Sequence, residues 1–246
     1  MADYERTIDG RFAYEYPAVY MTGDAVVFGF DGWQLFTLLV RRRNEPFQGR
    51  WAFPGGFMNV RMEDRENIEG CVRRELREET GIETEDAYLK QVGTFSDYGR
   101  DPRYRVVTTA YYVLVHMDKA QPKANDDASD ARWFPLKALP QPLAFDHDRI
   151  LRVALQRLKE DMHFRPVAFY MLPDPFTLPQ AQRLYEQILE TKFDRRNFLS
   201  KMNHSGFIHQ TGEKEESHTH RGGNYYHFEM KDYVSFKRSG LANTEF

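Results

Sequence analysis

In the stretch from Trp51 to Ile82, one face of a predicted helix changes from apolar to acidic. At about 100° per residue, three apolar side chains and two further carboxylates lie within about 60° of Glu75 around the helix. They are Ile68, Cys71, Val72, Glu75, Glu78 and Glu79. A helix with such a face packs on a sheet, so the sequence predicts an α/β fold in which carboxylates come close to the core.

The three glutamates have no other evident partner in the sequence, and burying an unpaired carboxylate costs several kcal/mol. They therefore need a compensating cation. Hard divalent ions such as Mg²⁺ take carboxylate oxygens as ligands, together with waters and phosphates. The helix face predicts such a metal site, and the alternative is a solvated helix end.

A glycine pair, Gly55 and Gly56, follows the strand-like run before this helix, and such a pair lets the backbone come close to a ligand. With Glu66 and the run Arg74-Glu75-Leu76-Arg77-Glu78-Glu79-Thr80-Gly81-Ile82, it resembles the Nudix box of pyrophosphohydrolases. From Glu66 onward every fixed position of the box is filled. Nine residues separate Gly56 from Glu66 where the family has five, so this loop is four residues longer.

The resemblance implies roles for these positions. The three glutamates and the Gly55 carbonyl would hold Mg²⁺ or Mn²⁺, and one glutamate would orient or deprotonate the attacking water. Glu66 and Arg74 would form an ion pair that supports the metal ligands, and Gly56 would contact the ligand. The implied catalytic set is Glu66, Arg74, Glu75, Glu78 and Glu79. The family's reaction splits a nucleoside diphosphate linked to another group.

Strand-like runs surround the predicted helix. Their β-branched and aromatic residues predict strands at 25–30, 35–40, 91–95, 105–115 and 131–134. Strands interleaved with a box helix suit the α/β/α sandwich of Nudix proteins, which we expect over residues 1–145. A turn-rich loop at 97–105 carries Arg100, Arg103 and Arg105, a set that suits a phosphate-bearing ligand. The alternative for this loop is a solvated surface.

Residues 146–246 predict a second unit. A connecting helix over 146–164 would be capped by Asp146 or Asp148, and a second helix by Thr177. A third helix would start at Asp194 and end at Gly206, as a C′ glycine. Strands at 207–209 and 225–228 would flank a polar loop. Helix, turn, helix and hairpin is the order of a winged helix-turn-helix.

The start of the third helix indicates DNA binding. Arginines in a first turn are unfavourable for the helix itself, because its N-terminus already carries partial positive charge. Arg, Asn and Lys are side chains that reach base edges and phosphates. The predicted DNA-binding residues are Arg195, Arg196, Asn197 and Lys201 on the helix, with His220 and Arg221 in the wing. The alternative is a dimerisation or docking domain with solvated arginines.

Taken together, the box, residues 145–147, residues 166–177 and the run Asp194-Arg195-Arg196-Asn197-Phe198 resemble the Nudix-related transcriptional regulators. The resemblance implies a homodimer that binds a near-palindromic DNA duplex and responds to a small molecule, ADP-ribose or a sugar. A Mg²⁺-dependent ADP-ribose-type pyrophosphohydrolase, whose second domain serves dimerisation, is the alternative function. The complete acidic half of the box supports that alternative.

Composition narrows the class of protein further. The single cysteine, Cys71, allows no disulfide within the chain, which fits a reducing cytoplasm. No apolar run approaches the roughly eighteen residues of a membrane span, and the first residues do not resemble an export signal. We therefore expect a cytoplasmic protein that does not bind membranes.

Overall fold

The computed structural model describes residues 18–59, 65–124, 128–215 and 223–238. Its larger sheet has the core order β3-β2-β1-β6-β5, with β4 added on β1 and β7 on β2. The strands are β1 (Tyr20–Phe30), β2 (Leu35–Arg42), β3 (Trp51–Ala52), β4 (Gly55–Phe57), β5 (Tyr88–Phe95), β6 (Val106–Leu114) and β7 (Ala128–Pro135). β1 and β6 are parallel, and the other pairs are antiparallel. All five predicted strands are confirmed, although the strand predicted over 105–115 is one residue shorter at each end.

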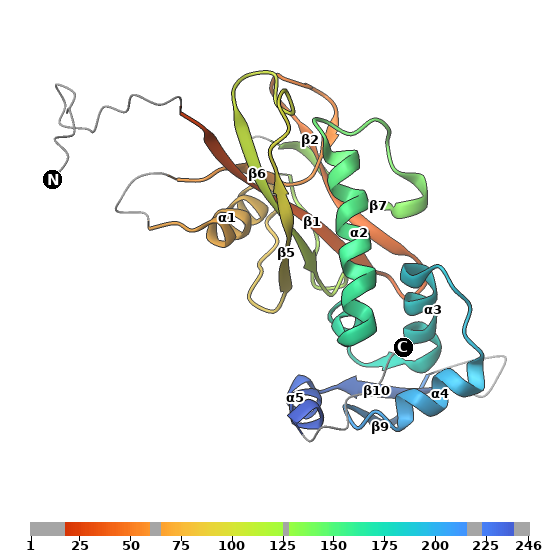
Figure 1. The fold of residues 1–246 in the computed structure, drawn as a ribbon. Coiled ribbons are helices and arrows are strands. Elements are labelled where there is room, and N and C mark those ends of the chain that lie inside the picture. The colour runs from red at the N-terminus through yellow and green to blue at the C-terminus, as the bar shows by residue number, and fades with distance from the viewer. Residues whose placement is uncertain (1–17, 60–64, 125–127, 216–222, 239–246) are drawn as a thin grey trace, which may run out of the picture.

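Both faces of the sheet are covered by helices (Figure 1). On β1, Ala25 and Val27 belong to the core under α1 (Ile68–Thr80), whereas Val26 and Phe28 belong to the core under α2 (His147–Phe164). Because successive strand residues point to opposite faces, one nearly all-apolar strand supplies both cores. The predicted α/β/α sandwich is confirmed, and its second helical layer is the helix that follows Asp146.

The close packing of α1 on β1 depends on Gly23. A Cβ at this position would lie 2.6 Å from Cγ2 of Val72. Replacing Gly23 by Ala is therefore expected to lower the free energy of unfolding by about 1–3 kcal/mol, because the helix must shift. Urea denaturation measures the loss. Gly93→Ala in β5 is the matched control, since nothing lies within 4 Å of its Cβ position; equal losses in the two variants would contradict the packing argument.

The C-terminal part has the winged helix order. It contains the 3-10 helix η2 (Val167–Met171), α3 (Leu178–Leu189), α4 (Arg195–Asn203), a three-stranded sheet and α5 (Met230–Arg238). The sheet order is β8-β10-β9, from β8 (Phe176–Thr177), β9 (Ile208–Lys214) and β10 (Asn224–Phe228). A further 3-10 helix, η1 (Leu136–Ala138), follows β7. The sequence did not predict β8 or α5.

Two of the predicted helix caps, Thr177 and Asp194, are confirmed, and the predicted end at Gly206 is not. Thr177 does begin α3, where its backbone N–H donates to the Gln180 side chain at 2.7 Å. Asp194 caps α4 by accepting from the backbone N–H of Asn197 at 2.9 Å. The predicted end of α4 at Gly206 is wrong: the helix ends at Asn203, because a tight turn follows in which Ser205 N–H donates to the Met202 carbonyl. Gly206, at φ +73°, lies beyond that turn.

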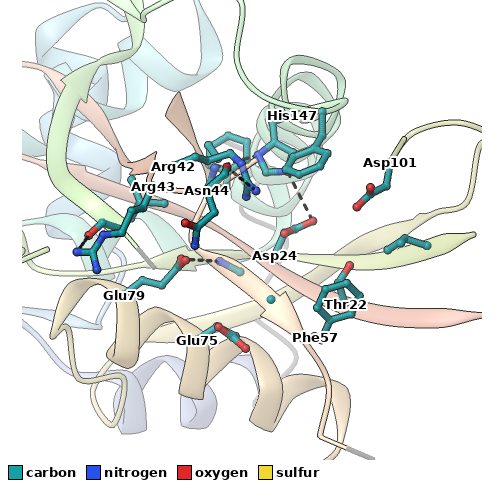
Figure 2. Close-up of a pocket in the computed structure, with 18 of the residues that line it drawn as sticks. Thr22, Asp24, Arg42, Arg43, Asn44, Phe57, Glu75, Glu79, Asp101 and His147 are labelled. Carbon is teal, nitrogen blue, oxygen red and sulfur yellow. Dashed lines mark hydrogen bonds and ion pairs between the residues drawn. The ribbon is translucent and has the colours of Figure 1, made fainter. Parts of the chain in front are cut away.

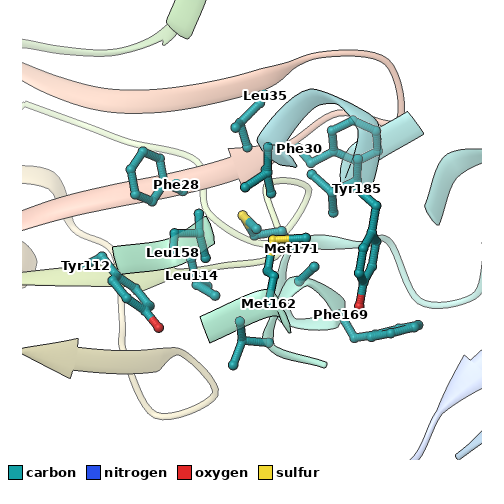
Figure 3. Packing of buried hydrophobic residues seen from close by; sticks show 14 of the residues in the cluster. Phe28, Phe30, Leu35, Tyr112, Leu114, Leu158, Met162, Phe169, Met171 and Tyr185 are labelled. Atoms are coloured by element: carbon teal, nitrogen blue, oxygen red, sulfur yellow. The ribbon is translucent and has the colours of Figure 1, made fainter. Parts of the chain in front are cut away.

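One buried apolar cluster runs from the large sheet through α2 into the winged helix part (Figure 3). Phe28 and Leu114 come from the sheet, Leu158 and Met162 from α2, and Tyr185 from α3. Since α2 packs on both sides, the structure does not itself mark the domain boundary at Phe145, which stays a prediction. No helix in the described part of the chain is long and apolar enough to cross a membrane.

A second contact joins the two parts at the β1–β2 turn. The Arg183 guanidinium of α3 donates to the Gly32 carbonyl at 2.6 Å and lies 3.8 Å over the Trp33 ring. Gln187, one helical turn later, donates to the Trp33 carbonyl and accepts from the Leu35 N–H. The orientation of α3 is therefore tied to the sheet at two separate places.

Candidate functional site

A cleft of about 340 Å³ opens where α1, β4, the end of β2, the 96–105 loop and the start of α2 meet (Figure 2). Its charged lining includes both signs. The acidic residues are Asp24, Glu45, Glu75, Glu79 and Asp101, and the basic ones are Arg41, Arg42, Arg43, Arg74, Arg100 and Arg103. Aromatic rings of Phe53, Phe57 and Phe145 line the same space. Such a mixture suits a ligand that is partly anionic and partly apolar.

Arg74 organises the acidic side of the cleft. Its Nε donates to Glu66 at 2.7 Å, and its Nη1 donates to Glu75 at 2.6 Å and to Glu78 at 2.9 Å. Its Nη2 donates to the Phe57 carbonyl at 2.9 Å. The expected pair of Glu66 and Arg74 is therefore present, and the pKa of Glu66 is lowered chiefly by this hydrogen bond.

The expectation that the three glutamates lack another partner is wrong. Arg74 precedes Glu75 and lies one helical turn before Glu78, so a single guanidinium reaches both carboxylates. Glu79 accepts instead from the Gly55 N–H at 3.0 Å. Only Glu75 and Glu79 line the cleft, whereas the Glu78 side chain is 38% exposed beside it.

The oxygen donors at the cleft fit a hard divalent cation. Burial raises the pKa of Glu79 to about 8 and also raises that of Glu75, which are the signs of carboxylates held away from solvent. In the described residues, however, no three acidic, histidine or cysteine side chains converge as a metal cluster. The set of Glu75, Glu78, Glu79 and the Gly55 carbonyl thus stays a prediction.

The glycine pair is explained by contact with these carboxylates. A Cβ on Gly56 would lie 2.5 Å from the Glu75 carboxylate, and a Cβ on Gly55 would lie 2.4 Å from Asp24 Oδ1. Strand β4 therefore approaches α1 and β1 as closely as a side-chain-free backbone allows. The longer loop after Gly56 does not move the pair away from α1, although residues 60–64 lie outside the described part.

The raised pKa of Glu79 predicts a pH dependence of stability without metal. The pKa of this group is about 8 in the folded chain, above its ordinary 4.5, so its ionisation between these values disfavours the folded state. Since one unit of pKa corresponds to about 1.4 kcal/mol, stability should fall on the order of 2–4 kcal/mol from about pH 5 to about pH 9. Glu79→Gln should remove this loss.

Thermal and urea unfolding in EDTA measure the effect. Saturating Mg²⁺ should restore stability to the wild type at high pH, because it binds the ionised carboxylate. Glu83→Gln, at an exposed position just after α1, is the control and should keep the wild-type profile. A flat profile in the wild type would show that Glu79 is not a buried acid.

The basic side of the cleft receives two of the three predicted arginines. Arg100 is only 5% exposed and donates to both oxygens of Asp146, at 2.8 and 3.2 Å. Arg103 pairs with Asp101 at 2.8 Å, and its guanidinium lies 5.5 Å over the Phe57 ring. Arg105 does not line the cleft; its guanidinium lies 5.7 Å over the exposed Tyr98 ring.

Sequence reasoning missed a buried polar group at the back of the cleft. His147 Nδ1 accepts from the Phe53 N–H at 2.9 Å, and burial lowers its pKa, so it is neutral near pH 7. Its Nε2 lies 3.9 Å from Asp24, which also accepts from Thr108 at 2.7 Å. Asp24 precedes an apolar run and His147 lies between Asp146 and Asp148, and neither pattern points to a place in a cleft.

The arginine run at 41–43 was also missed, although it did offer a signal. Three consecutive cations at the end of a strand place at least one toward each face of the sheet. Arg42 stacks 4.8 Å over the Phe145 ring, and Arg43 donates to the Ala128 carbonyl. Together with Asn44, they form the cleft wall at the end of β2 (Figure 2).

The predicted DNA-binding residues of α4 lie on its outer face. Arg195, Arg196, Asn197 and Lys201 are all exposed. Phe198 and Met202 point the other way, into the core beside α3. The helix is therefore fixed from beneath and presents its cationic N-terminal half to solvent. His220 and Arg221 lie outside the described residues, and the DNA contacts themselves stay a prediction.

Comparison with known proteins gives two family matches. Residues 23–154 match the NUDIX domain, and residues 168–228 match the NrtR DNA-binding winged helix domain. Over 220 residues, the chain is 34% identical to the ADPR responsive transcriptional repressor NtrR of Acinetobacter baylyi, covering 89% of this chain and 86% of that protein.

Two solved structures of Shewanella oneidensis NrtR are similar as well. The complex with a 27mer DNA has a TM-score of 0.75 and 33% identity, over 87% of this chain and 95% of that chain. The NUDIX domain complexed with ADP ribose has a TM-score of 0.53 and 36% identity, over 58% and 90%. The second match covers the part of the chain that contains the cleft.

Proposed function

The chain belongs to the Nudix family of regulators that carry an NrtR-type winged helix domain, and we propose that it is an ADP-ribose-responsive DNA-binding transcriptional regulator. The observation that carries the proposal is the pairing of an arginine- and carboxylate-lined cleft with an exposed cationic helix in one continuous fold. The Acinetobacter relative is a repressor, so we propose repression as the sign of regulation.

The cleft chemistry supports ADP-ribose as the effector. Arg100 and Arg103 offer planar guanidinium groups that suit diphosphate oxygens. The Phe57 and Phe145 rings give apolar surface for a base or a ribose. The solved ADP-ribose complex of the Shewanella NUDIX domain supports the same ligand class.

A divalent ion would be held on the acidic side of the cleft. Glu75 and Glu79 are the carboxylates that face the ligand space, and Arg74 fixes the first of them. Such an ion would neutralise charge on a bound diphosphate. Glu78, whose side chain does not line the cleft, is the weakest member of the three-glutamate set.

DNA binding is assigned to the exposed face of α4, with the wing after β9 as a second contact. A homodimer would present two such helices to a near-palindromic duplex. The solved complex of Shewanella NrtR with a 27mer DNA supports this mode. We also propose a cytoplasmic location, with which the free, buried Cys71 is compatible.

The experiment is a fluorescence anisotropy titration of the full chain against a duplex from the region upstream of its own gene. We expect specific binding that ADP-ribose weakens at least several-fold, while AMP and ribose 5-phosphate have little effect. Calorimetry measures ADP-ribose binding separately. Failure to bind any duplex, with ADP-ribose binding retained, would overturn the regulator assignment.

Hydrolysis is the second candidate function, favoured by the intact Arg-Glu-x-x-Glu-Glu of α1. If the chain splits ADP-ribose under Mg²⁺, Glu79→Gln should abolish the release of AMP, because the side chain faces the cleft. Glu78→Gln should reduce it less, since that side chain does not line the cleft. Equal turnover in wild type and Glu79→Gln would remove the metal-ligand assignment.

A further inference from the structure

Two ion pairs tie the 96–105 loop to the first turns of α2. Arg100 pairs with Asp146 at 2.8 Å, at the inner wall of the cleft, where the Arg100 side chain is 5% exposed and that of Asp146 17%. Asp97 pairs with Arg149 on the outer surface, where the side chains are 66% and 46% exposed. The pairs join the same two segments, but only the first borders the ligand space.

Asp146 is the N-cap residue of α2, yet its side chain makes no capping hydrogen bond. Aspartate at this position normally accepts from an N–H of the first helical turn. Here both carboxylate oxygens accept from Arg100 instead, Oδ1 from Nη2 and Oδ2 from Nε. The guanidinium therefore occupies the carboxylate, and the N-terminus of its own helix, the ordinary partner of an N-cap aspartate, is left without it.

We propose that the Arg100–Asp146 ion pair is the switch by which an anionic ligand in the cleft changes the position of α2. This inference rests on the proposed function. A diphosphate competes with Asp146 for the Arg100 guanidinium, which prefers bidentate phosphate or carboxylate partners. Asp146 then turns to cap α2, where the helix dipole favours a negative charge.

The exchange leaves no charge unpaired in either state. Without ligand, Arg100 is bound to Asp146 and lies 3.7 Å from Asp24. With ligand, Arg100 is bound to phosphate and Asp146 to backbone N–H groups. Two well-satisfied arrangements of one carboxylate form a two-state element of the kind that ligand binding can bias.

The structure offers a direct path from this switch to the DNA-binding helix. His147, next to Asp146, accepts from the N–H of Phe53, between β3 and β4, so the first turn of α2 is in direct contact with the cleft. Along α2, Leu158 and Met162 lie in the same buried cluster as Tyr185 of α3 (Figure 3). The Tyr185 ring contacts the ring of Phe198, in α4, at a centroid distance of 5.8 Å.

The test compares Asp146→Asn with Asp97→Asn. Asparagine keeps the shape and capping ability of the first position but loses the charge that holds Arg100. Asp97→Asn breaks the outer pair between the same segments and leaves the cleft intact. Both variants are checked by circular dichroism and melting, and their affinities for the upstream duplex and for ADP-ribose are measured by anisotropy and calorimetry.

In the wild type and in Asp97→Asn, we expect saturating ADP-ribose to weaken duplex binding at least about fivefold. In Asp146→Asn, saturating ADP-ribose should weaken duplex binding less than about twofold. The variant should also bind the duplex more weakly before ligand is added and bind ADP-ribose more tightly. Linkage requires that the duplex weaken ADP-ribose binding by the same factor as ADP-ribose weakens duplex binding, and a general loss of packing would not tighten ligand binding.

The outcomes separate the inference from the function. A wild type that does not respond to ADP-ribose overturns the proposed function. A responsive wild type whose response Asp146→Asn retains overturns the switch alone. Should Asp146→Asn fail to fold, hydrogen exchange of the wild type decides: ADP-ribose should slow exchange in the first turn of α2, and unchanged exchange there contradicts the proposal.

Discussion

Replacing Arg195 and Arg196 together by Ala is expected to abolish sequence-specific duplex binding while leaving the fold intact. Both side chains are exposed in the first turn of α4, and the core contact of that helix comes from Phe198 and Met202. Thermal stability should stay equal or rise slightly, because two cations leave the positive end of a helix, worth roughly 0.3–1 kcal/mol each.

The form of the loss distinguishes the contacts. If the arginines bind phosphates, affinity falls for all sequences. The slope of log affinity against log salt concentration then becomes shallower by about one unit per lost contact. If one holds a guanine edge, discrimination at a single base position falls by roughly 1–3 kcal/mol. Arg157→Ala, an exposed arginine paired with Glu160 on α2, is the control. Equal duplex binding by wild type and the double variant would leave the C-terminal part as a dimerisation domain and favour the hydrolase.

Replacing Arg74 by Ala should be the most destabilising single change at the cleft. The variant leaves Glu66, Glu75 and Glu78 without their shared cation, and the first two side chains are only 9% and 15% exposed. Removing one partner of largely buried ion pairs costs about 2–4 kcal/mol. Urea unfolding measures this loss, and Mg²⁺ should recover part of it by taking over the carboxylates.

Arg73→Ala provides the matched comparison. Arg73 is the neighbouring arginine, pairs with Glu69 at 2.9 Å in an exposed i,i+4 arrangement, and donates to the Thr84 carbonyl. Its loss should cost less than about 1 kcal/mol. If the two variants were equally stable, the carboxylates around Arg74 would have to be satisfied by solvent.

The parts of the site that the sequence predicted are those encoded within one helix. Spacing alone places Glu75 and Glu79 on the inward face of α1, whereas the pair of Glu66 and Arg74 was implied by the resemblance to the Nudix box. The same spacing could not show that Arg74 also holds Glu78, because which of several carboxylates a long side chain selects depends on the burial around it. Helical spacing therefore predicts which side chains share a face of α1, and it does not predict which of them form ion pairs.

The back of the cleft was beyond sequence reasoning for a different reason. Asp24 lies in β1 and His147 at the start of α2, and they meet because the fold brings β1 against the start of that helix. A polar residue within an apolar run is equally compatible with a strand end or a turn. In the winged helix part, Thr177 and Asp194 predicted where α3 and α4 begin, but the end of α4 at Gly206 was wrong. Strand β8 was missed because two residues give no period.

The shared apolar cluster also bears on how such a regulator can be rebuilt. Its members come from the sheet, from α2 and from the winged helix part, so these parts share one hydrophobic core and are not independent domains that can be exchanged. Grafting residues 168–228 onto a different sensor would separate η2 and α3 from α2, against which both of them pack. A change of effector is therefore more accessible through substitutions inside the cleft than through exchange of whole domains.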